Sequence, residues 1–277
     1  MNEDPRTAVA DEAEPTEAPR PRRKGIYVLP NAITLAALFS GFYAIVMAMN
    51  GRFDVAAVGI FCAAILDSLD GRVARMTNSQ SAFGEQMDSL CDMVNFGAAP
   101  ALIVLEWALK DLGKIGWIAA FVYISAAALR LARFNTNIGV VDKRFFQGLP
   151  SPAAAALVMG LIYVMDDAGF RGVSKIGWLS WTAFGVTLYA GLSMVTNAPF
   201  YSFKVVGGKR TVPFVVIVAI ALGIALISLH PPIALFAVFC SYGLSGYGVY
   251  AWRKLKGKPT SVIAISTDDP DEKGLHP

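Results

Sequence analysis

Long apolar runs alternate with short polar connections along most of this chain. Most of the runs have about the 20 residues that a helix needs to cross the apolar core of a bilayer. They occupy eight stretches, at residues 26–49, 54–75, 84–108, 114–134, 151–166, 177–197, 212–229 and 231–252. The pattern predicts an all-α, polytopic membrane protein with about eight transmembrane helices.

The composition supports a membrane protein and argues against some other classes. Hydrophobic residues make up 55% of the chain and charged residues only 16%, whereas soluble domains carry roughly 25% charged residues. The net charge of +3 is too small to indicate a nucleic-acid partner. The three cysteines show no metal-type spacing and are expected to be apolar helix residues.

The two ends of the chain differ from its middle. Residues 1–25 begin as an acidic, Ala- and Pro-rich stretch without periodicity, and residues 253–277 are similarly polar, so we expect two disordered tails. Basic residues are concentrated in one alternating set of connections, including 20–24 and 252–258. Because basic loops stay on the inner side of a membrane, both tails are predicted to be cytoplasmic.

Four aspartates lie at the cytoplasmic edge of the second and third runs. Asp67 and Asp70 have i, i+3 spacing, and Asp88 and Asp92 have i, i+4 spacing, so each pair lies on one helix face. Four carboxylates that faced lipid would be costly, and four that faced each other would repel. Divalent cations remove both problems, and carboxylate ligands suit Mg²⁺, Mn²⁺ or Ca²⁺ better than zinc. Two such ions are typical of displacement at phosphorus.

The residues between the aspartates favour a phosphate ligand. Gly71, Ala74 and Gly84 leave space near the backbone, and Arg75 offers a planar guanidinium for phosphate oxygens. Two other interpretations compete with this one. The acids could form ordinary interfacial ion pairs, or they could be the ion sites of a cation transporter. A transporter is disfavoured because the acids cluster at one end and the sequence shows no repeat.

The pattern DxxDGxxAR followed by GxxxDxxxD, at residues 67–92, resembles the signature of the CDP-alcohol phosphatidyltransferase family. Members move a phosphatidyl or similar group from a CDP-linked donor to an alcohol and release CMP. The resemblance implies a six-helix catalytic core at 26–200, two additional helices at 201–252, and a homodimer. It also implies an active site on the cytoplasmic side of the plasma (inner) membrane.

The resemblance also assigns roles to individual residues. Two Mg²⁺ or Mn²⁺ ions would be held by Asp67, Asp70 and Asp88 and by Asp67, Asp88 and Asp92, and Asp92 would take the proton of the attacking hydroxyl. The PNAIT stretch at 30–34 is similar to an early donor-contacting segment. The implied contacts of the donor, CDP-diacylglycerol, are therefore Asn31, Thr34, Gly71, Ala74, Arg75, Ser81 and Gly84.

Three further stretches bear on the acceptor alcohol. LRLARFN at 129–135, FFQGLPSP at 145–152 and NAPFYSFK at 197–204 resemble family members whose acceptor is L-serine. Arg130, Arg133 and Asn135 are the candidate acceptor residues, and the last two are the preferred pair. Their charges could also reflect only the positive-inside rule. Glycerol 3-phosphate or inositol stays open as an alternative acceptor.

Overall fold

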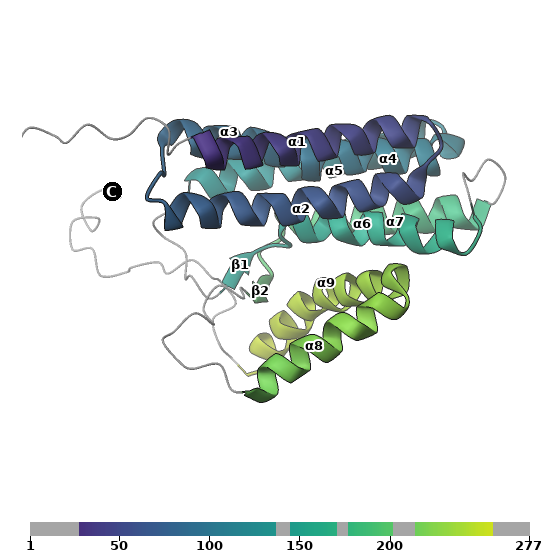
Figure 1. Cartoon of the computed structure of the whole chain (residues 1–277). Helices are drawn as coiled ribbons and strands as arrows, with labels where there is room; N and C mark the ends of the chain where they lie inside the picture. The colour runs from purple at the N-terminus through teal and green to yellow at the C-terminus, as the bar shows by residue number, and fades with distance from the viewer. Residues whose placement is uncertain (1–27, 137–144, 171–176, 202–213, 257–277) are drawn as a thin grey trace, which may run out of the picture.

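The computed structural model describes residues 28–136, 145–170, 177–201 and 214–256. The predicted N-terminal tail and residues 257–277 of the C-terminal one lie outside this part of the chain. The described residues form an all-α fold, as predicted, with one short pair of strands added to it (Figure 1). The α-helices are α1 (Val28–Met49), α2 (Phe53–Met76), α3 (Ala82–Asp92), α4 (Ala99–Trp107), α5 (Lys114–Thr136), α6 (Ser151–Asp167), α7 (Gly177–Val195), α8 (Phe214–Leu229) and α9 (Pro231–Leu255).

The chain is a polytopic membrane protein. Within the described residues, four helices are long and apolar enough to cross a bilayer, namely α1, the continuous helix Ala82–Trp107, α5 and α9. Because α3 and α4 belong to one continuous helix, the described residues contain eight helical segments at the predicted places. The count of eight membrane spans stays a prediction. Among the other four segments, α6 and α8 are shorter than the usual span. Helix α2 is long enough but carries five charged residues, Asp54, Asp67, Asp70, Arg72 and Arg75.

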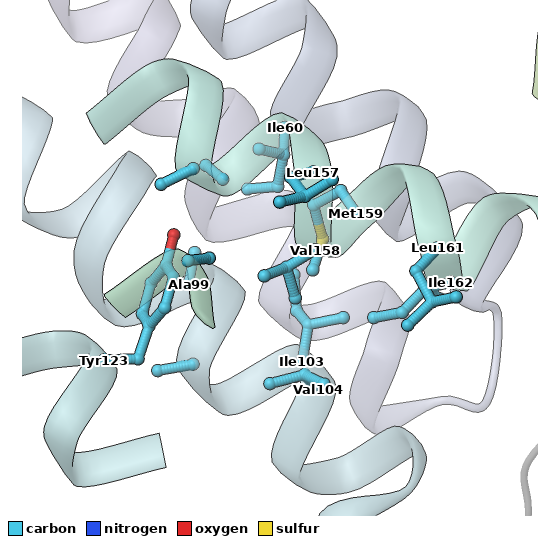
Figure 2. Packing of buried hydrophobic residues seen from close by; sticks show 14 of the residues in the cluster. Ile60, Ala99, Ile103, Val104, Tyr123, Leu157, Val158, Met159, Leu161 and Ile162 are labelled. Carbon is cyan, nitrogen blue, oxygen red and sulfur yellow. The ribbon is translucent and has the colours of Figure 1, made fainter. Parts of the chain in front are cut away.

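Helix α6 lies at the centre of the packing. Most of its residues are buried, and it packs against α2, α4, α7 and α9. Figure 2 shows Val158 and Met159 of α6 in one cluster with Ile60 of α2 and Ile103 of α4. The alanines at 153–156 allow neighbouring helices to approach closely. Small residues are common at helix contacts in a bilayer, where association depends on close packing rather than on the hydrophobic effect.

Small residues bring α1 and α2 together in the same way. The Ser40 hydroxyl donates a hydrogen bond of 2.8 Å to the carbonyl of Gly59. A Cβ atom added at Gly59 would lie 3.0 Å from the Cβ of Ala44. This close packing matters for function because α1 and α2 both contribute residues to the site described below.

Two short strands are an element that the hydrophobic pattern does not predict. Strand β1 (Phe145–Gln147) pairs antiparallel with β2 (Pro199–Tyr201), and Phe146 lies opposite Phe200. Three residues are too few to show a strand period. Gly148 follows β1 with φ +78° and its N–H donates to Ala198. An added Cβ there would lie 2.4 Å from the Met194 carbonyl oxygen, so glycine is required at this turn.

The third helical segment contains a π-helical turn, η2 (Met93–Ala98), between α3 and α4. Turns of this kind are frequent at functional sites. The Tyr123 hydroxyl of α5 donates 3.0 Å to the carbonyl of Phe96 in this turn. Asn95 is fully buried there, and a Cβ added at Gly41 of α1 would lie 2.1 Å from its Oδ1 atom. The turn therefore adjoins α1 closely just after Asp92.

Candidate active site

The four aspartates come from two adjacent helix ends. Asp67 and Asp70 lie in the last turns of α2, and Asp88 and Asp92 lie in α3. The connection is compact because Ser81 is the N-cap of α3 and accepts a hydrogen bond of 3.0 Å from the N–H of Gly84. Ser and Thr are preferred at this position since their side chains satisfy a free N–H at the helix start. The cap fixes where α3 begins relative to α2.

Three of the carboxylates converge. Asp67, Asp70 and Asp88 each place one oxygen within 4.8 Å of the others. Asp70 is only 4% exposed, and the other two are half-buried. Hard divalent cations such as Mg²⁺ and Mn²⁺ prefer oxygen ligands of this kind. The donor set therefore fits the predicted type of metal, and repulsion between three carboxylates so close together favours a bound cation.

Asp92 lies beside this group of three. Its carboxylate neighbours that of Asp67, and the charge of Arg130 acts on it from α5. Its Oδ1 atom is buried and has no hydrogen-bond partner among the described residues. A buried carboxylate oxygen without a donor is costly. It is therefore available to a ligand, whether a metal ion or the proton of a substrate hydroxyl.

Thr34 of α1 touches the cluster directly. Its hydroxyl lies 2.7 Å from Oδ2 of Asp70 and 3.1 Å from the carbonyl of Pro30. The resemblance implies a donor contact for this residue, and the structure adds a hydrogen bond to a candidate metal ligand. Partners of this kind orient a ligating carboxylate and are part of a metal site.

A cavity of about 230 Å³ opens beside Asp70 and Asp88, between α1, α2 and α3. Arg75 is exposed and Gly71 has open space where a Cβ would stand. The seven residues predicted to contact CDP-diacylglycerol all line this cavity. They are Asn31, Thr34, Gly71, Ala74, Arg75, Ser81 and Gly84.

A second cavity, of about 720 Å³, lies on the other side of the carboxylates. It shares Asp70, Gly71, Arg75 and Asp88 with the first one. The rest of its lining includes Asp67 of α2 and Asp92 of α3. On the facing side are Arg130 of α5, Phe146 of β1, and Pro150, Ser151 and Pro152 at the start of α6. The carboxylates thus stand between two spaces that meet at the same residues.

Of the three candidate acceptor residues, Arg130 alone is in this lining. Its Nη1 atom donates 2.8 Å to the hydroxyl of Ser151, and its buried Nε–H has no hydrogen-bond partner among the described residues. Arg133 instead donates 3.2 Å to the Val195 carbonyl at the end of α7. Asn135 donates 3.1 Å to Ser89 of α3.

Sequence reasoning did not single out Ser151 as a site residue. The sequence signal for it is the FFQGLPSP stretch at 145–152, which bears on the acceptor alcohol but does not single out one residue. It ends at the start of α6, with Pro150 as the N-cap, and it also forms cavity wall. The stretch therefore starts a helix and lines the larger cavity at the same place.

Comparison with known proteins agrees with the site. The family model for CDP-alcohol phosphatidyltransferase matches residues 27–192. The chain belongs to this family, a class of membrane enzymes.

Particular relatives narrow the class further. A Helicobacter pylori (strain J99) protein named CDP-diacylglycerol–serine O-phosphatidyltransferase is 34% identical over 82% of this chain and 92% of its own length. Proteins with the same name from Mycobacterium leprae and Methanocaldococcus jannaschii are 33% and 29% identical. They match over 82% and 80% of this chain and 76% and 95% of their own lengths.

Proposed function

We propose that this protein transfers the phosphatidyl group of CDP-diacylglycerol to L-serine and forms phosphatidylserine and CMP. The observation that carries the proposal is the position of the carboxylates between two cavities. The smaller one is lined by every residue predicted for the donor, and the larger one contains Arg130. The names of relatives that match most of the chain support serine as the acceptor.

The reaction follows from this arrangement. The serine hydroxyl oxygen forms a bond to the phosphorus of the phosphatidyl group while the bond from that phosphorus to the CMP oxygen breaks. The electron pair leaves with CMP, and the hydroxyl proton passes to the Asp92 carboxylate. Arg75, exposed in the smaller cavity, attracts the negative diphosphate. The guanidinium of Arg130, in the larger cavity, suits the serine carboxylate.

The carboxylates of Asp67, Asp70 and Asp88 would hold one Mg²⁺ or Mn²⁺, and Asp67, Asp88 and Asp92 would hold a second. When bound, such ions neutralise the diphosphate and stabilise the leaving group. The chain's own part is to gather these oxygens at two helix ends and to orient Asp70 through Thr34.

Asp92 is proposed as the base for two reasons. It lines the larger cavity, where the acceptor would bind, and it lies outside the group of three carboxylates. Asp92→Asn is expected to lower turnover by about 10²- to 10⁴-fold, the usual contribution of a general base. Binding of CDP-diacylglycerol should survive, and extra metal should not restore turnover. The matched control is Asp54→Asn, an exposed aspartate at the opposite end of α2. Normal turnover of the Asp92 variant would remove it as the base.

The function is tested by CMP release from CDP-diacylglycerol by the purified protein in detergent with Mg²⁺ or Mn²⁺. Serine, glycerol 3-phosphate and inositol are offered separately. Release that depends on serine and is abolished by a chelator is the expected result. Release with another alcohol would overturn serine as the acceptor and retain the aspartate chemistry. No release with any alcohol would favour a cation-binding role.

The position in the membrane and the assembly are part of the same proposal. The distribution of basic residues favours a cytoplasmic active site and cytoplasmic termini. The donor's acyl chains stay in the bilayer, so the donor cavity must be reachable from lipid. The homodimer stays a prediction, which cross-linking in membranes followed by mass determination would test.

A further inference from the structure

Helix α9 lies beyond the part of the chain that the family model matches, which ends at residue 192. It is nevertheless bound firmly to the rest of the protein. Gly160 of α6 packs against Phe236, where an added Cβ would lie 3.2 Å from the Phe236 Cα atom. The rings of Phe61 and Phe239 stack with centroids 6.2 Å apart and join α2 to α9. The helix therefore has a fixed place beside the catalytic helices.

The second half of α9 packs against strand β2. The Tyr242 hydroxyl donates 3.2 Å to the carbonyl of Tyr201. The buried ring of Phe200 lies against the rings of Tyr242 and Tyr247, with centroids 5.8 and 6.2 Å away. A Cβ added at Gly246 would lie 2.3 Å from this ring, so the glycine leaves the room that Phe200 occupies.

Strand β2 in turn holds a wall of the larger cavity. Phe200 is paired with Phe146 of β1, and Phe146 lines the cavity. The chain then runs from β1 through Gly148 directly into Pro150 and Ser151, which line it as well. Any shift of β2 would therefore be transmitted to this wall over a few residues of chain.

The same helix also acts on Arg130. The Tyr242 hydroxyl and the guanidinium interact electrostatically. Since the hydroxyl donates its proton to Tyr201, its oxygen presents lone pairs, which is the polarity that suits a neighbouring cation. On its other side Arg130 is tied to Ser151. The bond to Ser151 and the nearby Tyr242 oxygen thus surround a guanidinium whose Nε–H is buried and has no partner in the described part of the chain.

We propose that α9 contributes to the acceptor site in two ways. Tyr242 is a positioning residue for Arg130, and the contact of α9 with Phe200 keeps the wall of the larger cavity in place. The unpartnered Nε–H of Arg130 is the donor that is kept ready for an anionic acceptor such as the serine carboxylate. This inference rests on the proposed function, and it adds a determinant of acceptor recognition outside the matched region.

The test compares steady-state kinetics of Tyr242→Phe with the unaltered enzyme. The change removes one hydroxyl and keeps the ring against Phe200. The KM for serine should rise roughly 2- to 10-fold, as expected for the loss of one hydrogen bond. The KM for CDP-diacylglycerol, the metal requirement and the melting temperature should stay the same. Tyr250→Phe is the matched control, because it removes an exposed hydroxyl from the same helix.

Two results would overturn the proposal. One is an unchanged KM for serine, and the other is a joint rise of both KM values with a lower melting temperature, which a merely structural role would produce. CMP release by the unaltered enzyme shows separately whether the proposed function is correct. If it uses another alcohol, the same comparison is made with that alcohol. If no alcohol supports CMP release, the inference falls together with the proposed function.

A second pair of variants independently tests the contact between Gly246 of α9 and the Phe200 ring. Gly246→Ala would push against the ring, whereas Gly248→Ala has no atom within 4 Å of the new Cβ. The first is expected to raise the KM for serine more than the KM for CDP-diacylglycerol, and the second to change neither. Equal behaviour of the two variants would contradict a role of this contact in the acceptor site.

Discussion

The hydrogen bond from Thr34 to Asp70 offers the sharpest test of how the fold prepares the site. It is 2.7 Å long and joins two residues that are 5% and 4% exposed. Thr34→Val replaces the hydroxyl by a methyl group of similar size, so packing between α1 and α2 is nearly kept. What is lost is the donor that orients the Asp70 carboxylate.

The size of the effect follows from the kind of bond. A hydrogen bond to a charged group contributes about 1.5–3 kcal/mol, which corresponds to roughly a 10- to 150-fold change in an equilibrium constant. Loss of such a partner of a metal ligand lowers metal affinity by a similar 10- to 100-fold. We therefore expect Thr34→Val to need one to two orders of magnitude more Mg²⁺ or Mn²⁺ for half-maximal CMP release. Activity at saturating metal should largely return.

The assay is a metal titration of CMP release after removal of metal with a chelator. Thr34→Ser keeps the hydroxyl and should titrate like the unaltered enzyme. Thr182→Val is the control, because it removes an exposed hydroxyl that bonds only within α7, to the carbonyl of Trp178. An unchanged titration with a raised KM for CDP-diacylglycerol would refute the reasoning. Thr34 would then act by contacting the donor, as the resemblance implies.

Two further predictions concern a metal ligand and the helix packing. Asp67→Asn should lose activity and metal dependence together, because Asp67 belongs to the group of three carboxylates and neighbours Asp92; an unchanged metal titration would exclude it as a ligand. Gly41→Ala should lower stability by about 1–3 kcal/mol, the usual cost of overpacking, since its Cβ would lie 2.1 Å from Asn95 Oδ1. Thermal unfolding in detergent checks this against Gly185→Ala, whose Cβ meets nothing within 4 Å, and equal melting temperatures would show that the turn at Asn95 adjusts freely.

Much of the fold follows from local patterns. The helical segments lie where the apolar runs predict them, because a bilayer core forces buried backbone groups to pair within a helix. The third segment also has nearly the predicted extent, although its π-turn at 93–98 carries no periodic signal. The β1–β2 pair depends on contacts between residues some fifty positions apart, such as Phe146 and Phe200, and no local pattern encodes it.

The candidate site, too, could be predicted from the sequence only in part. The spacing of the aspartates determines that they share helix faces, and the short connection between α2 and α3 brings Asp67, Asp70 and Asp88 together. The spacing of Arg130 and Arg133 suggests one common surface. The structure lines the cavity with Arg130 and directs Arg133 to the end of α7.

The sequence by itself therefore determined the membrane class, the helical segments and the aspartate cluster. These depend on composition, period and short-range spacing, which are properties of neighbouring residues. Only the tertiary structure decided that Thr34 bonds to Asp70, that Ser151 bonds to Arg130, and that Tyr242 of α9 interacts electrostatically with the same arginine. Each of these pairs joins different helices, and the rotation of a helix about its axis is set by packing against its neighbours rather than by its own sequence period.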